Sequence, residues 1–401
     1  MSNASNPSLD RRRRYAGPAL FSYGFRVFFL CASLWAAFGV LIWLPIYLGY
    51  VPFVTAFGPQ DWHVHEMIFG YAAAAIAGFL LTAIPNWTGR LPVNGWPLAG
   101  LAALWLAGRI AILASASLGP LLTAAIDVSF LTTLAFVCAR EIVAGKNWRN
   151  LRVLGVIAAL TAANVFFHAE VYGLGAADYS LRLAFSAVIV LICLIGGRIV
   201  PSFTNNWLAR NNPGRLPVPF SRYDAVTLAA SIVALAGWIV APTAEWAGAA
   251  LLAAGAMQAF RLWRWVGYRA AGDPLVLVLH VAYAFVPLGF VLTGLSLVTD
   301  LPGSAGIHAF GAGAVGLMTL AVMTRASLGH TGHALRAGPA TLLIYIMVFA
   351  GAILRVGAAL TGHVVVLEAA GLLWIGGFAL FAAAYGPILV RARPAWAEAR
   401  C

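Results

Sequence analysis

Uncharged apolar runs make up most of the sequence, and one of them follows directly on the polar motif DWHVHEMIFG at residues 61–70. The run from Gly70 to Ile84, GYAAAAIAGFLLTAI, contains no charge. A membrane-spanning α-helix needs about 20 apolar residues to cross a hydrocarbon core of roughly 30 Å. Continuous runs of this kind do not fit the alternating polarity of a membrane β-barrel, so the sequence predicts an all-α membrane protein.

The composition excludes an ordinary water-soluble fold. Hydrophobic residues make up 62% of the 401 residues and charged residues only 9%, whereas soluble domains carry about 25% charged residues. The formal net charge of +12 comes from arginines in short loops, which indicates membrane topology rather than a nucleic-acid partner. The four cysteines form no CxxC motif, so neither a disulfide framework nor a thiolate metal site is expected.

Apolar runs bounded by Pro, Gly, Asn or Arg predict a bundle of about twelve transmembrane helices. Lysine and arginine fall in every second loop, beginning with Arg11–Arg14, and the opposite loops at 51–62, 173–179 and 298–304 contain neither. The positive-inside rule therefore predicts that both termini are cytoplasmic. The predicted spans are residues 25–50, 63–85, 97–117, 120–141, 150–172, 180–203, 224–242, 246–265, 274–297, 305–326, 339–361 and 364–391.

We expect a single transmembrane domain at residues 21–392, with a disordered basic cytoplasmic leader at 1–20 and a cytoplasmic tail at 393–401. The first apolar run lacks a small-residue cleavage site, so the leader is interpreted as retained. A weak internal repeat is also present. His65 and His308 are 243 residues apart, as are the Thr-Gly pairs at 88–89 and 331–332. Segments two and three thus correspond to segments ten and eleven.

Five histidines are predicted at outer helix ends. An ionisable group within a membrane usually marks a functional site, and neutral imidazole binds copper, zinc, iron and haem iron. A copper site, a haem ligand set, or both are therefore open, beside the simpler interpretation of interfacial histidines bound to water. His363 lacks polar neighbours and fits the simpler interpretation. The outer histidines are His63, His65, His168, His308 and His363.

The spacing of His63 and His65 matters, because two residues on a regular helix diverge by roughly 200°. Both rings can reach one ligand only if His63 stands on the incoming loop, with Asp61 as a helix N-cap. Glu66 suits the first helical turn. His168 and Glu170 close segment five at the same outer level.

The inner side has a second group of polar residues. His280 is isolated among aliphatic residues, which fits either an axial haem ligand or a hydrogen bond to a neighbouring helix. His330 and His333 lie just past segment ten, with Arg325 near them, and His333 is interpreted as a solvated or headgroup contact. Pro201 is expected to break segment six. Arg198, one turn earlier, is then expected to bind the freed carbonyls or an anion such as a haem propionate.

Several blocks together resemble the NnrS family of bacterial membrane proteins. They are WHVHEMIFGYAAAAIAGFLLTAIPNWTG (62–89), HAEVYGLG (168–175), GGRIVPSFTNNWL (197–208), LHVAYAFVPLGF (279–290) and HAFGAGAVGLMTLAVMTRASLGHTGH (308–333). The resemblance implies a role in nitric oxide metabolism, with haem b and copper as cofactors, in the bacterial inner (cytoplasmic) membrane. The patterned histidines that match are His63, His65, His168, His280, His308 and His330.

Three functions follow from these features. The first is a metalloprotein that binds nitric oxide or reduces it to N2O, with His63, His65, His168 and His308 as an outer metal set and His280 and His330 as axial or second-site ligands. Glu66 and Glu170 would conduct protons, and a quinol or redox protein would supply electrons, since no CxxCH motif is present. The alternatives are a twelve-helix secondary transporter and a membrane regulator that buffers nitric oxide without turnover.

Overall fold

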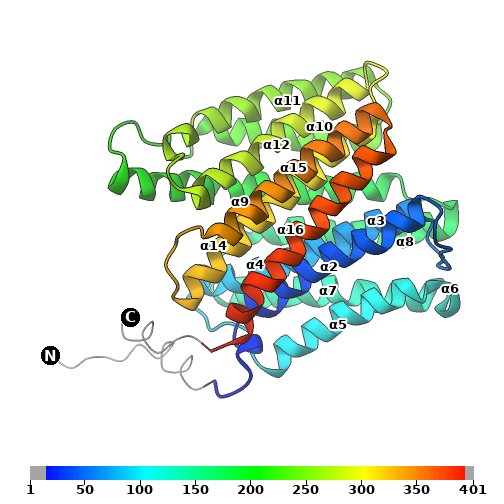
Figure 1. Ribbon diagram of the computed structural model, residues 1–401, viewed down its shortest axis with the longest axis horizontal. Coiled ribbons are helices and arrows are strands. Elements are labelled where there is room, and N and C mark those ends of the chain that lie inside the picture. The colour runs from blue at the N-terminus through cyan, green and yellow to red at the C-terminus, as the bar shows by residue number, and fades with distance from the viewer. Residues whose placement is uncertain (1–14, 393–401) are drawn as a thin grey trace.

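The computed structural model describes residues 15–392, which form helices and, within that range, no β-strand (Figure 1). Residues 1–14 of the predicted leader and the whole predicted tail lie outside the described residues. The longer helices are α2 (Gly24–Tyr47), α4 (Ala73–Thr88), α5 (Trp96–Leu113), α7 (Pro120–Ala144), α8 (Leu151–Leu174), α9 (Tyr179–Asn211), α10 (Arg222–Val240), α11 (Glu245–Trp263), α12 (Pro274–Ser296), α14 (Gly316–Thr331), α15 (Pro339–Thr361) and α16 (Val364–Val390).

Shorter elements join or extend these helices. The α-helices α3 (Pro59–His65) and α13 (Gly303–His308) continue through the π-helical segments η2 (Glu66–Ala72) and η5 (Ala309–Val315) into α4 and α14. The remaining short elements are η1 (Ala19–Phe21), α6 (Ser115–Leu118), η3 (Trp148–Asn150) and η4 (Gly267–Ala270). Every predicted span coincides with one long helix or with one of these continuous helical runs, which confirms the all-α bundle.

Eleven helical runs within residues 15–392 are long and apolar enough to cross a membrane. In hydrocarbon such runs must be helical, because each backbone N–H and C=O needs a partner within the segment. The twelfth predicted span is α11, which is more polar. Its Arg261 is buried and pairs with Asp224 at 3.0 Å, and its Gln258 accepts a hydrogen bond from Tyr283 at 2.8 Å. The polar residues of α11 are therefore neutralised inside the bundle.

Helices that follow one another in the chain mostly pack side by side, and the last one closes the bundle. Helix α16 packs against both α15 and α2, so the C-terminal helix lies beside the first long helix (Figure 1). At this junction Arg26 donates hydrogen bonds to the carbonyl oxygens of Ile388, Leu389 and Arg391, at 3.2, 2.8 and 2.7 Å. The two ends of the described chain thus lie at the same end of the bundle.

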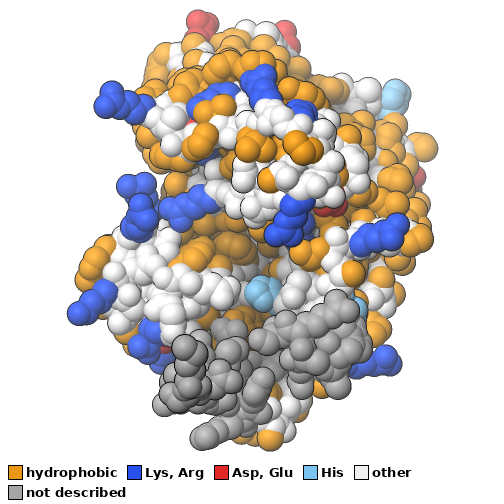
Figure 2. Space-filling model, turned by 90° about the vertical axis from the view of Figure 1, so that its left-hand side faces the viewer, with side chains coloured by type: hydrophobic (Ala, Val, Ile, Leu, Met, Phe, Trp, Pro, Cys, Tyr) orange, Lys and Arg blue, Asp and Glu red, His pale blue; other side chains and the backbone are white. Residues whose placement is uncertain are grey.

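That end of the bundle carries many of the basic side chains (Figure 2). Lys and Arg side chains surround its surface, with hydrophobic side chains between them. The even number of predicted spans and the alternation of basic loops require the termini to share one face, and the observed geometry agrees with that requirement.

The two interrupted helices correspond residue by residue. Segment η2 begins directly after His65 and segment η5 directly after His308, and both end seven residues later. The spacing of 243 residues that the sequence repeat predicts therefore also relates the two π-helical segments. Such segments are rare and occur mostly at functional sites. The repeat stays a prediction, to which these matched interruptions add a structural correspondence.

Glycine allows close packing at both interruptions. A Cβ on Gly70 would lie 2.6 Å from Trp35 Nε1 and 2.9 Å from Arg109 Nη1, and a Cβ on Gly313 would lie 2.1 Å from the ring of Phe285. Larger residues at these two positions would displace their neighbours, since real Cβ contacts are not this short.

Two local predictions are wrong. Helix α9 runs through Pro201 without a break, although Pro201 removes the backbone N–H that would bind the carbonyl oxygen of Gly197. Side-chain bonds on both sides of Pro201 tie α9 to neighbouring helices: Arg261 donates to Cys193 O at 3.0 Å, and Thr204 Oγ1 hydrogen-bonds with His280 Nε2 at 2.7 Å. The N-cap of α3 is Gly58 rather than Asp61, which lies in the first turn and accepts from the backbone N–H of Ala177 at 3.2 Å.

Candidate metal and cofactor sites

Helix α3 separates the two histidines of the opening motif. The helix starts at Pro59, so His63 stands within it and not on the incoming loop, as a shared ligand would have required. The two rings therefore lie on different faces, as the helical angle between them demands. His65 is fully buried among polar groups of α5, α7 and α8, whereas His63 lines a cavity between α2, α13 and α15.

The first site is a buried polar cluster around His65, Asp127 and His168. Asp127 Oδ2 lies 3.1 Å from His65 Nε2 and 3.1 Å from His168 Nε2. Asn164 adds its Oδ1 at 3.2 Å from His65 Nε2 and donates to Asp127 at 2.9 Å. One donor atom from each member of the triad lies within 4.8 Å of the other two. Two imidazoles and one carboxylate that converge in this way are a known ligand set for transition metals.

Glu66 and Arg109 complete this cluster. Glu66 Oε1 lies 2.9 Å from His65 Nδ1 and accepts from Arg109 Nη1 at 2.6 Å, while Arg109 Nη2 pairs with Asp127 Oδ1. Metal-bound histidines usually donate their second ring N–H to such a carboxylate, which fixes the ring. Glu66 would therefore orient His65, so that its Nε2 faces Asp127.

The charges in this cluster leave one negative charge to balance. Glu66 and Asp127 carry two carboxylates, and Arg109 supplies one positive charge; all three are almost completely buried. A buried charge must be compensated, here by a proton on His65 or by a bound cation. Glu66 Oε2, Arg109 Nε and His168 Nδ1 are buried without a hydrogen-bond partner. These unsatisfied atoms fit a cluster that accommodates a further ion or molecule.

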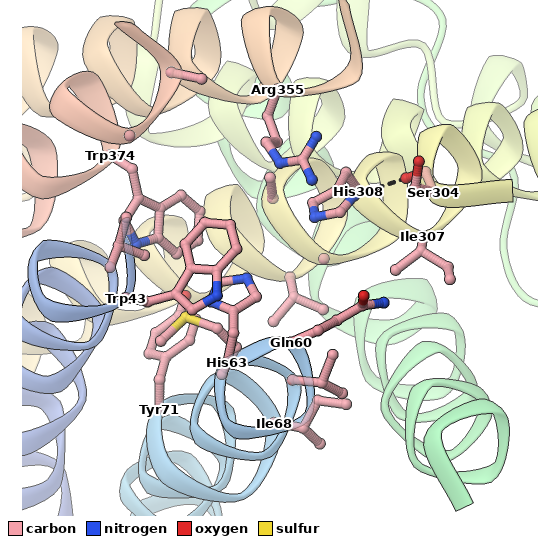
Figure 3. A pocket seen from close by; sticks show the side chains of 18 of the residues that line it. Trp43, Gln60, His63, Ile68, Tyr71, Ser304, Ile307, His308, Arg355 and Trp374 are labelled. Atoms are coloured by element: carbon pink, nitrogen blue, oxygen red, sulfur yellow. Dashed lines mark hydrogen bonds between the residues drawn. The ribbon is translucent and has the colours of Figure 1, made fainter. Parts of the chain in front are cut away.

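The second site is a cavity of about 370 Å³ between α2, α3, α13, α15 and α16. Figure 3 shows His63, His308 and Arg355 pointing into it from three separate elements, with Trp43 beside His63. The His63 and Trp43 rings stack with centroids 4.0 Å apart and an angle of 23°. The Nδ1 atom of His63 is buried and has no hydrogen-bond partner, so this nitrogen is available to a ligand.

The tautomer of His308 is set by its backbone. His308 Nδ1 lies 2.7 Å from the carbonyl oxygen of Ser304 (Figure 3), and because a carbonyl only accepts, Nδ1 carries the proton. The Nε2 of neutral His308 then keeps its lone pair, which is the form that binds metal. Arg355 forms no ion pair with any carboxylate of residues 15–392 and brings a positive charge to the cavity. The cavity thus offers two imidazoles and an anion-binding group.

The predicted outer metal set is therefore divided between two places. His65 and His168 belong to the buried cluster, and His63 and His308 belong to the cavity. Sequence reasoning missed the roles of Asp127, Asn164, Arg109 and Arg355. A signal for Asp127 was present, since it is an acidic residue well inside the predicted span 120–141 and ionisable residues in such spans are usually functional.

Glu170, predicted as a proton carrier, caps a helix. Its carboxylate accepts from the backbone N–H groups of Asp178, Tyr179 and Ser180 at 2.9, 3.0 and 3.0 Å, and from the Ser180 hydroxyl at 2.5 Å. These N–H groups belong to the start of α9, where a helix lacks internal acceptors. The contacts account for Glu170 without a role in proton transfer.

We expect Glu170→Ala to lower the free energy of unfolding by about 1–2 kcal/mol, the usual cost of losing a helix cap, with unchanged metal content. Thermal unfolding in detergent and metal analysis check this. Glu170→Gln, which keeps an acceptor oxygen, is the matched control and should lose less. Unchanged stability combined with a loss of proton-coupled activity would restore Glu170 as a proton carrier.

The inner predicted residues do not join either site. His280 Nε2 hydrogen-bonds with Thr204 Oγ1 at 2.7 Å, and Gly267 packs so closely on the ring that a Cβ there would lie 2.3 Å from it. The hydrogen-bonded alternative thus accounts for His280. The other three lie apart: His330 stacks on Tyr23, Arg198 donates to Asn150 at 3.0 Å, and Arg325 lies 4.2 Å above the ring of Phe203.

A bundle of apolar helices around buried imidazoles, carboxylates and arginines defines a multi-pass α-helical membrane protein with candidate metal sites in its interior. The chain belongs to the NnrS family, since its residues 19–393 match the family described as NnrS protein. This membership confirms the predicted resemblance and fits a membrane protein linked to nitric oxide metabolism. A comparison with curated proteins found no match.

Proposed function

We propose that this protein binds haem b and copper through its histidines and binds nitric oxide at the resulting metal site, in the bacterial inner membrane. The observation that carries the proposal is the pair of ring nitrogens, His63 Nδ1 and His308 Nε2, that belong to separate helices and border one cavity. Nitric oxide is small, uncharged and lipid-soluble, so a site among membrane helices is accessible to it.

We assign the haem to the cavity. Its volume of about 370 Å³ lies within the range of roughly 300–1,000 Å³ for cofactor pockets. His63 and His308 would hold the haem through their ring nitrogens, and Arg355 would bind a propionate through a charge-assisted hydrogen bond. Trp43 stacks on His63 and Trp374 lines the same wall, so aromatic surface surrounds the donors.

We assign the copper to the buried cluster. His65, His168 and Asp127 would be the ligands, with Glu66 holding the ring of His65. The single uncompensated negative charge of the cluster favours a cation there, and a monovalent ion such as Cu(I) would balance it completely. When bound, haem iron and copper would supply a coordination position for nitric oxide and one-electron redox chemistry.

The remaining steps fall to the protein. Reduction of two nitric oxide molecules to N2O and water consumes two electrons and two protons. Glu66 is buried next to His65 and has one carboxylate oxygen without a partner, so it is the residue we assign to pass protons on near the copper site. A quinol or a redox protein would supply the electrons.

The test uses purified full-length protein loaded with haem and copper. We expect a haem absorption band, stoichiometric copper, and an anaerobic shift of that band on addition of nitric oxide. With a chemical reductant, formation of N2O would identify turnover, whereas binding without N2O would favour the buffering alternative. Protein that stays free of both cofactors after reconstitution, or that binds them without responding to nitric oxide, would contradict the proposal. His63→Ala/His308→Ala is the matched negative control.

The transporter alternative has one structural feature in its favour. The helical runs 59–88 and 303–331 are both interrupted by a π-helical segment, and interrupted helices often form binding sites in secondary transporters. Solute uptake by metal-free protein in liposomes would favour this alternative over the metalloprotein.

A further inference from the structure

A second, smaller cavity of about 70 Å³ lies between α4, α9 and α14. Helix α4 packs mainly against α2 and α7, whereas α9 packs against α8, α10 and α12, which leaves space between these two helices. Apart from Thr319 and Gly196, the residues that line this space carry aliphatic, thioether or phenyl side chains, Ala75, Ile195 and Met318 among them. Apolar cavities of this kind stay dry and bind small apolar molecules such as xenon.

The two cavities adjoin each other. Ala72, Val188 and Val315 line both of them. We call the cavity that His63 and His308 line the histidine cavity. Tyr71 lies on the wall of this cavity (Figure 3), and Thr319 lies on the wall of the apolar cavity. The two side chains hydrogen-bond with each other where the cavities meet. This contact joins η2 to α14 and satisfies the two hydroxyl groups where the lining changes from polar to apolar. The residues that line the apolar cavity include no ionisable group.

The wall of the apolar cavity also extends to the outside of the bundle. Phe79, Ile199 and Val322 form part of its wall and are partly exposed. In a membrane the surroundings of these side chains are acyl chains. A molecule dissolved in the hydrocarbon core would thus meet an apolar opening that leads towards His63 and His308.

We propose that this apolar cavity is a passage through which small uncharged molecules, nitric oxide in particular, pass from the hydrocarbon core to the histidine cavity. The delivery of nitric oxide rests on the proposed function; the binding of an apolar gas does not. Water and ions are excluded, because the passage offers almost no hydrogen-bond partner to replace those lost on leaving water. Protons and electrons would therefore use other routes.

The first experiment needs no cofactor. A crystal of the full-length protein pressurised with xenon should show xenon next to Ala75, Ile195 and Met318. Ala75→Phe fills this space and should abolish that density. Ala253→Phe, the same change at an exposed position of α11, is the matched control and should retain it. Absence of xenon from this cavity in the wild type would overturn the proposal.

The second experiment measures delivery in protein loaded with its metals. Ala75→Phe and, from the opposite wall, Ile195→Phe should slow nitric oxide association by about tenfold or more, with little change in equilibrium affinity, because a passage controls access and not binding. Ala253→Phe should associate at the wild-type rate. Variants that exclude xenon but bind nitric oxide at the wild-type rate would overturn the proposal that this cavity is the passage. Xenon binding in a protein that binds no nitric oxide would support gas binding by the cavity and contradict the proposed function instead.

Discussion

Replacing Asp127 with alanine is expected to lower the free energy of unfolding by about 3–5 kcal/mol, the range observed when one partner of a buried ion pair is removed. Asp127 pairs with Arg109 and bonds with His65, His168 and Asn164, all of them buried. Without Asp127, Arg109 keeps Glu66 as its single carboxylate and the two imidazoles lose their shared partner. Denaturant titration or thermal unfolding in detergent measures the loss.

The matched control for this change is Asp178→Ala. Asp178 also forms an ion pair with an arginine, Arg182, at 2.6 Å, but its side chain is 64% exposed. Its partner Arg182 is only 9% exposed, but the Asp178 carboxylate itself faces water, so this variant should lose clearly less free energy of unfolding than Asp127→Ala. An equal loss of free energy of unfolding in Asp127→Ala and Asp178→Ala would contradict the inference that burial makes the Asp127 ion pair the more important one. Asp127→Asn preserves volume and one acceptor, and reports on metal binding even if the alanine variant does not fold.

The second large effect concerns the four outer histidines, whose alanine variants should separate into two classes. His63→Ala and His308→Ala should lose the cofactor of the cavity, and His65→Ala and His168→Ala should lose the metal of the buried cluster. Each loss is expected to be about tenfold or more in occupancy, since removal of even a supporting group around a metal costs roughly 10–100-fold in affinity. Absorption spectra and metal analysis of the same preparations measure both.

His363→Ala serves as the control for this series. His363 is an exposed histidine at the start of α16 and lines neither site, so both signals should remain. Simultaneous loss of both signals in all four variants would indicate one shared site and refute the separation into two. Retention of both signals in all four would refute histidine ligation altogether.

Much of the fold was predictable because hydrocarbon leaves a chain few choices. An apolar run such as Gly70–Ile84 has to form a helix in lipid. The alternation of basic loops indicates on which side of the membrane each loop lies, and so in which direction each helix crosses. The predicted helix break at Pro201 was wrong, because tertiary contacts there outweigh the local preference of the residue. Pro201 disfavours a helix locally, yet α9 continues through it because Arg261 and His280 of neighbouring helices bind α9 on either side of the proline.

The candidate sites were predictable in part. The predicted depth in the membrane placed His63, His65, His168 and His308 in one outer group. The helical angle allowed His63 and His65 to share a ligand only if His63 stood outside the helix. Their partners were not predicted, since Arg109, Asp127 and Asn164 come from three other helices and are far from His65 in the sequence. No local pattern records which faces of distant helices meet.

The sequence by itself determined that the chain is a multi-pass helical membrane protein with basic loops at one end, because the cost of exposing charge or unpaired backbone to lipid acts on each segment independently. The tertiary structure alone decided that the outer histidines form two sites. The reason is physical: the rotation of each helix about its axis is set by packing against several neighbours at once, and that rotation decides whether His63 and His65 face the cavity or the buried carboxylates.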